Sequence, residues 1–260
     1  MGARTLAVRV FGPITMDLVG VLSLSGIAVL IGAAVGATGI GGFLLIPALW
    51  LMLDMPLRDA MGTTLVASAA NGALATCLFA RRGSVPWRMA MPLCAGALVC
   101  AFVGGMLNAI VSTVILAKLL GGVIVVGSAY ILMNRGNTTA REPTGGALLL
   151  LGIGLVSGLI AGLTGAGGPL ISVPLMTVLH FPYLTTVGAS QVLQLVASAS
   201  GAVAYWQHGA VSFAILAVII PFQLLGIWGG VRLAHWLDVV IARRALAIAG
   251  VLIGSMLIVF

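Results

Sequence analysis

Charged residues are scarce in this chain, and their scarcity sets its class. Only 7% of its 260 residues are Asp, Glu, Lys or Arg, while 61% are hydrophobic and the mean hydropathy is +1.24. A soluble domain carries about 25% charged residues. So few charges cannot solvate a globule of this size, and lipid is the natural solvent for such a chain. The composition predicts an all-α polytopic membrane protein.

Acidic side chains are missing from the interior of every long apolar run. All five lie at the ends of such runs or in the joints between them: Asp17, Asp54, Asp59, Glu142 and Asp238. No carboxylate is therefore placed to serve as an intramembrane proton relay. The three cysteines form no CxxC pair and no Cys/His cluster with metal-ligand spacing, and no HExxH or serine-nucleophile motif is present. We expect no catalysis and neither a metal nor a cofactor.

Basic residues exceed acidic ones, which gives a formal net charge of +7. The Lys and Arg residues are dispersed between apolar runs and form no patch, so we expect no nucleic-acid partner. Two interpretations of the excess stay open. Basic residues collect in the cytoplasmic loops of membrane proteins, and a positive field attracts anions.

What the chain has in abundance is apolar runs long enough to cross a bilayer, which takes about 20 residues per helix. Eight runs have about this length: 17–38, 60–80, 88–107, 112–133, 145–163, 186–206, 211–233 and 237–259. Two shorter runs, 41–53 and 167–180, each follow a glycine-rich break. We predict about eight full transmembrane helices plus two short segments, or ten crossings if the short segments span the membrane.

The two short runs belong to an internal duplication. Residues 36–42 read GATGIGG, and residues 162–168, which lie 126 positions later, read GLTGAGG. The same offset aligns Pro56 with Pro182 and Gly83 with Gly209. We predict a first transmembrane repeat over 1–133, a linker over 134–144 and a second repeat over 145–260, a duplicated design that is common in secondary transporters.

The number of crossings in each repeat decides the topology. If each short segment dips in and returns, each repeat crosses four times and the repeats are parallel. If it crosses, each repeat crosses five times and the repeats are inverted. Inversion places eight of the twelve basic residues on the cytoplasmic side: Arg81, Arg82, Arg88, Arg135, Arg141, Arg232, Arg243 and Arg244. The parallel arrangement places seven there, so the positive-inside rule favours inversion only slightly.

The two glycine-rich breaks are the candidate binding site. Dense glycine weakens a helix and permits positive φ, so the chain can unwind and turn there. Irregular backbone at membrane depth is tolerated only inside protein or beside a water-filled cavity. A helix that starts after such a break presents unpaired N–H groups and the positive end of its dipole, which together bind an anion without a charged side chain. The competing interpretation is tight helix packing through small residues.

Polar side chains in the helix after each short segment extend the candidate site. They either line the pathway or only join helices by hydrogen bonds, and both interpretations stay open. Together with the break residues, the predicted substrate-binding set is Thr38, Gly39, Gly41, Gly42, Ser68, Asn71, Thr164, Gly165, Gly167, Gly168, Ser190, Gln191 and Gln194.

These features resemble the TauE/SafE family of sulfite exporters. The resemblance rests on the two breaks, on Pro47 and Pro174 in the segments that follow them, and on the joints at 81–85 and 207–211. It covers nearly the whole chain from about residue 17, and it implies movement of sulfite, sulfoacetate or other sulfonates. In the second half, residues 188–190 read GAS where residues 62–64 read GTT, so an identical role for the two halves does not follow.

The sequence thus predicts an inner-membrane permease for small anions that works within the lipid bilayer, with its oligomeric state left open. The alternative is a non-transporting membrane scaffold or assembly subunit. An anion that leaves a negative-inside cell gains about 2.3 kcal/mol per charge per 100 mV. Export therefore needs no coupling carboxylate, and we expect electrogenic export.

Overall fold

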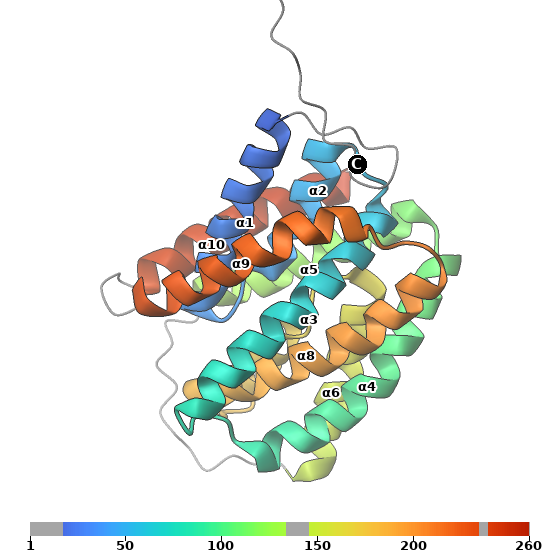
Figure 1. Cartoon of the computed structure of the whole chain (residues 1–260). Coiled ribbons are helices and arrows are strands. Elements are labelled where there is room, and N and C mark those ends of the chain that lie inside the picture. The colour runs from blue at the N-terminus through green and yellow to red at the C-terminus, as the bar shows by residue number, and fades with distance from the viewer. Residues whose placement is uncertain (1–17, 134–145, 234–238, 260) are drawn as a thin grey trace, which may run out of the picture.

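The computed structural model describes residues 18–133, 146–233 and 239–259, and within them the chain is all-helical with no strand. Ten α-helices and one short 3₁₀ helix follow one another along these residues (Figure 1). Their bounds are α1 Leu18–Thr38, η1 Gly42–Leu44, α2 Leu45–Leu53, α3 Leu57–Arg81, α4 Trp87–Ile110, α5 Thr113–Met133, α6 Ala147–Thr164, α7 Pro169–Val178, α8 Tyr183–Gln207, α9 Phe213–Leu233 and α10 Val239–Val259.

The helices coincide with the apolar runs of the sequence. Seven of them are long and apolar enough to cross a bilayer, namely α1, α3, α4, α5, α6, α8 and α9. The short helices α2 and α7 follow the two breaks, and α10 is a 21-residue helix whose apolar stretch is described from Arg244 to Val259. The chain is thus a multi-pass helical membrane protein, as predicted, while the number of crossings stays a prediction. The linker predicted over 134–144 lies outside the described residues.

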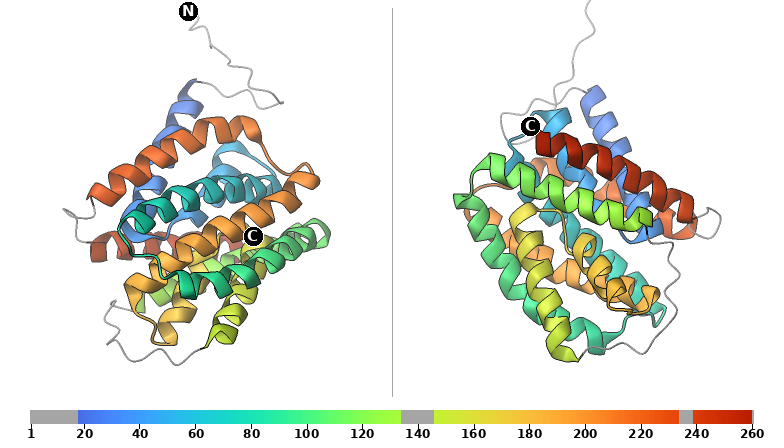
Figure 2. Two further views of the ribbon diagram at one scale, coloured as in Figure 1. Left: turned by 60° about the horizontal axis from the view of Figure 1, so that its bottom comes forward. Right: turned by 180° about the vertical axis from the view of Figure 1, so that it is seen from behind.

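Glycines bring helices from the two halves of the chain into backbone contact. α1 packs along α9, and α6 packs along α4 (Figure 2). A Cβ added at Gly36 of α1 would overlap the carbonyl oxygen of Ile227 in α9, and one added at Gly162 of α6 would overlap that of Ala101 in α4. Only glycine fits at such a distance. The first glycine of each break sequence therefore serves packing, as the competing interpretation held.

The central helices α3 and α8 run antiparallel to each other. Gly62, near the start of α3, lies against the carbonyl of Ala210, which follows the end of α8. Gly188, near the start of α8, lies against the carbonyl of Ser84, which follows the end of α3. Each helix therefore begins where the other one ends, and their middles lie at the same level of the bundle.

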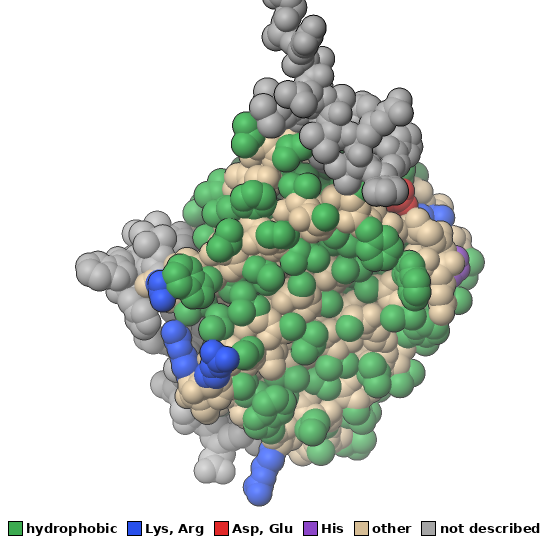
Figure 3. Space-filling view, viewed as in Figure 1, with side chains coloured by type: hydrophobic (Ala, Val, Ile, Leu, Met, Phe, Trp, Pro, Cys, Tyr) green, Lys and Arg blue, Asp and Glu red, His purple; other side chains and the backbone are tan. Residues whose placement is uncertain are grey.

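The surface consists of a broad apolar face between polar edges. In Figure 3, most visible Lys and Arg side chains gather along the left and lower edge, basic, acidic and histidine side chains lie together at the upper right, and hydrophobic side chains cover the face between them. Exposed arginines lie at the end of α3, the start of α4, the end of α9 and the start of α10: Arg81, Arg82, Arg88, Arg232 and Arg244. An apolar face between polar edges is what a bilayer requires.

Candidate functional site

The first glycine-rich break separates α1 from the short helix α2. Beyond the end of α1 at Thr38, the backbone turns through Gly39 and Gly41, whose φ angles are +76° and +142°. Residues other than glycine rarely adopt such φ angles. The Thr38 hydroxyl donates to the carbonyl of Ala34 at 2.7 Å and accepts the N–H of Ile40 at 3.2 Å. This threonine therefore stabilises the turn from within.

The second break, between α6 and α7, repeats this geometry. Gly165 and Gly167 have φ angles of +73° and +78°. The Thr164 hydroxyl donates to the carbonyl of Ile160 at 2.7 Å and accepts the N–H of Ala166 at 3.4 Å. The shared Thr-Gly-x-Gly-Gly sequence thus folds into the same kind of turn twice, and in both turns the threonine hydroxyl contacts local backbone.

A short helix begins directly after each break. Pro169 opens α7, at a position where the missing N–H is no loss, and Gly42 opens the 3₁₀ turn that leads into α2. α2 has 9 residues and α7 has 10, so at 1.5 Å per residue each is about half as long as the hydrocarbon core is thick. α2 continues directly from η1, so the start of η1 and the start of α7 carry the positive ends of the two helix dipoles. Phe43 and Pro169 at these starts are buried, so both positive ends lie inside the protein.

The two breaks meet at the middle of the central helices. A Cβ built on Gly42 would lie 3.6 Å from the hydroxyl oxygen of Ser68, and one built on Gly167 would lie 3.9 Å from the same oxygen. Ser68 is near the midpoint of the 25-residue helix α3, and Gln194 is near the midpoint of the 25-residue helix α8. The Gln194 amide donates to the Ser68 carbonyl at 3.3 Å. The site thus lies halfway along both spans.

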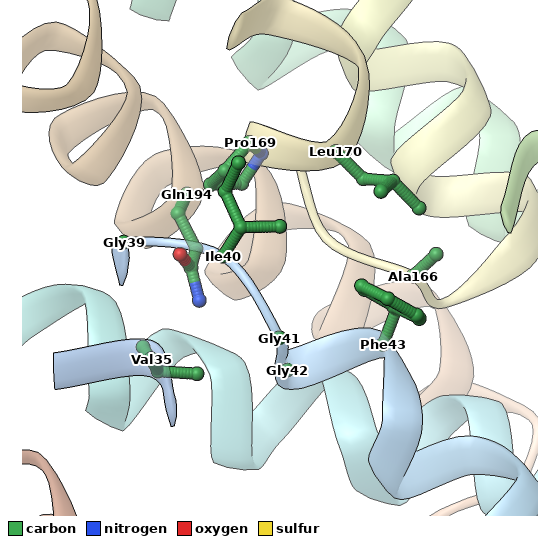
Figure 4. A pocket seen from close by; sticks show the side chains of 10 residues that line it. All are labelled: Val35, Gly39, Ile40, Gly41, Gly42, Phe43, Ala166, Pro169, Leu170 and Gln194. Atoms are coloured by element: carbon green, nitrogen blue, oxygen red, sulfur yellow. The ribbon is translucent and has the colours of Figure 1, made fainter. Parts of the chain in front are cut away.

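A cavity of about 10 Å³ lies between the two breaks (Figure 4). Both breaks, the helix starts after them and one polar side chain form its wall: Val35, Gly39, Ile40, Gly41, Gly42, Phe43, Ala166, Pro169, Leu170 and Gln194. Figure 4 shows Gln194 beside Gly39 and Ile40 of the first break, and no charged side chain lies among these lining residues. A space of about 10–15 Å³ holds roughly one water molecule. The space between the breaks is therefore smaller than an oxyanion.

Two other predicted residues join α8 to the breaks. The Gln191 amide donates to the carbonyl of Gly39 at 3.1 Å. The Ser190 hydroxyl lies 2.9 Å from that of Ser172 in α7. These contacts join α8 to the first break and to α7, so both side chains form hydrogen-bonding contacts between elements in this structure.

The remaining break glycines provide close contacts. A Cβ at Gly165 would lie 2.8 Å from the Cα of Met61 in α3. A Cβ at Gly168 would overlap the side chain of Leu193 in α8. The break glycines thus include some that line the cavity, Gly39, Gly41 and Gly42, and others that let α3 and α8 approach it, Gly165 and Gly168.

One polar residue in the middle of the bundle escaped the sequence analysis. Asn71, a predicted site residue, donates through its amide to the side-chain oxygen of Gln223 in α9 at 3.0 Å. Both residues are buried, with exposed fractions of 1% and 0%. The signal that could have found Gln223 is its isolation, because it is an amide in the middle of an otherwise apolar span.

Comparison with known proteins places the chain in a family. The family model described as "Sulfite exporter TauE/SafE" matches residues 24–257, which is most of the chain. The chain belongs to the TauE/SafE family. The resemblance drawn from the break sequences is therefore confirmed.

Relatives of this TauE/SafE protein carry the names of transporters. It is 24% identical over 238 residues to "Probable membrane transporter protein YdhB" of Bacillus subtilis, which covers 86% of this chain and 96% of the relative. It is 24% identical over 197 residues to "Probable membrane transporter protein MJ0441" of Methanocaldococcus jannaschii, with 71% and 73% covered. A "Probable membrane transporter protein" of Xylella fastidiosa (strain 9a5c) is 38% identical over 93 residues, with 35% and 34% covered.

No solved structure matches the chain. The family and the names of these relatives indicate a membrane transporter rather than an enzyme.

Proposed function

We propose that the protein is an inner-membrane permease that exports small anions such as sulfite, sulfoacetate or other sulfonates. One observation carries the proposal: two half-length helices begin at a common cavity at the middle of the central spans. Each helix start is equivalent to about +0.5 elementary charge, so the pair offers an oxyanion about one positive charge without a Lys or Arg. The description of the family supplies the substrate class. The residues assigned to substrate contact are Gly41, Gly42, Ser68, Gly167 and Gln194.

The proposed architecture is a pair of inverted repeats. α3 and α8 begin 126 positions apart, as do α5 and α10. The contact of Gly36 with Ile227 has its counterpart, shifted by 126 in both partners, in that of Gly162 with Ala101. Parallel repeats would give equivalent spans the same direction, whereas α3 and α8 run in opposite directions, which supports inversion. The exposed arginines of α3, α4, α9 and α10 then share the cytoplasmic side.

Transport by this architecture requires the two repeats to move. The cavity has room for about one water molecule, so neither an oxyanion nor a sulfonate fits in it as it stands. Inverted repeats give such a protein two related conformations, one open to each side, around a site that stays near the midplane. The wall formed by both breaks would then open on alternate sides.

The membrane potential sets the proposed direction. A divalent anion that leaves a cell at roughly 150 mV, negative inside, gains about 7 kcal/mol, enough for a gradient on the order of 10⁵. Uptake would work against the same potential and would need a coupled cation. The acids in the described residues, Asp54 and Asp59, lie beside the end of α2 and in the first turn of α3, away from the cavity. Export driven by the potential needs no such coupling site.

Purified protein in proteoliposomes tests the function. We expect it to move sulfite or a sulfonate from a panel of sulfur oxyanions and sulfonates, with a rate that rises as the loaded side is made more negative. Protein-free liposomes and liposomes with the Gly42→Val variant are the controls. Correctly inserted protein that moves no member of the panel would favour the scaffold. Transport that requires a proton or sodium gradient would overturn the uncoupled mechanism.

A further inference from the structure

Three buried amides lie near the middle of the bundle, one of them bonded to the first break, and each has an atom without a hydrogen-bond partner. Gln191 donates to the Gly39 carbonyl, which leaves its own oxygen unpaired. Asn71 donates to Gln223, which leaves the Asn71 oxygen and the Gln223 amide nitrogen unpaired. All three side chains are nearly inaccessible, with exposed fractions of 0–1%. The cluster thus holds two amide oxygens that accept no hydrogen bond and one amide nitrogen that donates none.

The three amides lie close to one another in level within the bundle. The Gln194 amide reaches the Ser68 carbonyl, and a Cβ at Gly72 would lie 2.7 Å from the backbone nitrogen of Leu195. Because α3 and α8 are antiparallel, these contacts place Asn71 and Gln191 within about one to one and a half helical turns of each other. Gln223 reaches the same place from α9, and its backbone lies against Gly32 of α1, the helix that ends at the first break.

The cluster has no counterpart in the other half of the chain. Shifted by 126 positions, Asn71 corresponds to Ala197, Gln191 to Leu65 and Gln223 to Ala97. These three apolar residues are fully buried, each with an exposed fraction of 0%. The fold thus packs this place with apolar side chains on one side of the bundle, so packing alone does not require the amides on the other side.

Unpaired amide atoms in a buried place are costly, by about 1–3 kcal/mol each, and polar groups at membrane depth mark substrate pathways. A fully deprotonated oxyanion offers only acceptors and would leave both amide oxygens unpaired. A hydroxyl group, by contrast, donates one hydrogen bond and accepts others. It would donate to one amide oxygen and accept from the Gln223 N–H.

We propose that Asn71, Gln191 and Gln223 form a second subsite, which binds a hydroxyl group of the transported anion. The substrate is then an anion that carries a hydroxyl, such as hydrogen sulfite or a hydroxyalkanesulfonate. The charged group binds at the helix starts between the breaks, and the hydroxyl binds beside the first break. This subsite rests on the proposed function, because it assumes that the anion site lies at the breaks.

Two probes of equal size test the subsite. In propane-1-sulfonate a methyl group stands where 2-hydroxyethanesulfonate has its hydroxyl. We expect the purified full chain in detergent to bind the hydroxyl probe at least tenfold more tightly, because a site built to bind a hydroxyl rejects the analogue without one. The matched variant Asn71→Ala/Gln223→Ala introduces the residues that the chain uses at the equivalent places. It should bring the ratio of the two Kd values to about one and change the Kd of propane-1-sulfonate by less than about threefold.

Gln191→Leu, which copies Leu65, is an independent variant should the double variant fail to fold, and it should lower the same ratio. Equal affinity of the wild-type protein for both probes would overturn the subsite. A ratio of the two Kd values that stays the same in the folded variants would overturn it too. Either result would leave the anion site standing. If neither probe binds and no sulfur oxyanion is transported, the proposed function fails together with the subsite.

Discussion

Gly42→Ala should stop transport without weakening the fold. Gly42 is the first residue of the 3₁₀ turn that leads into α2, and its φ lies outside the positive region. A Cβ built there would meet no atom closer than the Ser68 hydroxyl oxygen, at 3.6 Å, which is an ordinary contact distance. The added methyl group therefore neither strains the backbone nor clashes. It points toward the residue on which both breaks converge.

The expected effects on stability and on transport differ in size. Without strain or clash, the free energy of unfolding should change by less than about 0.5–1 kcal/mol. The cavity, however, measures only about 10 Å³, so a methyl group at its wall takes up much of the space from which a binding site must open. We expect the transport rate to fall at least tenfold with alanine and below detection with valine.

The measurement pairs transport in proteoliposomes with thermal unfolding of the same protein in detergent. Gly229→Ala is the matched control, because Gly229 in α9 has nothing within 4 Å of an added Cβ, and it should keep both transport and stability. Wild-type transport by a well-inserted Gly42→Ala protein would refute the location of the site. An equal loss in Gly229→Ala would show that the assay responds to any added methyl group.

Three further predictions address the turns, the topology and the energetics. Gly167→Ala should lose transport. Its control is Gly209→Ala, because Gly209 has a similar φ of +70° but lies in an exposed turn with open space around it. The control should lose only the stability that a left-handed alanine costs, about 1–2 kcal/mol, and equal transport by the two variants would contradict this prediction. Single cysteines beside Arg82 and Arg244 should react with an impermeant thiol reagent from the same, cytoplasmic side, and labelling from opposite sides would support parallel repeats instead. Net export should rise with an imposed inside-negative potential, and a net flux that is indifferent to the potential would exclude electrogenic export.

The elements of the fold were predictable because their signals are local. Each apolar run from the sequence contains one helix, and the break at Thr164 to Gly168 has the positive φ angles that its glycines predict. Pro169 opens α7, as a proline without an N–H should. Such features depend on a few neighbouring residues, so the sequence displays them directly.

The composition of the site was only partly predictable, because its decisive contacts are remote in sequence. Asn71 and Gln223 are 152 positions apart, and so are Gly39 and Gln191. The sequence offered Thr38 as a ligand, but its hydroxyl is occupied by the backbone of its own turn. Whether a polar side chain faces a cavity or closes a turn depends on the packing of distant helices, which periodicity does not reveal.

The absence of charged side chains from the cavity wall is consistent with electrogenic transport. A Lys at the middle of a span would cost about 2.5–3.5 kcal/mol to insert, and its charge would cancel that of a bound monovalent anion. Helix starts attract the anion but carry no net charge, because the negative end of each dipole lies at the far end of the same helix. The empty carrier then moves no net charge through the midplane, whereas the loaded carrier moves that of its anion. In the proposed mechanism the membrane potential would therefore act on the loaded step, and the two breaks that bind the anion would make its export depend on the potential.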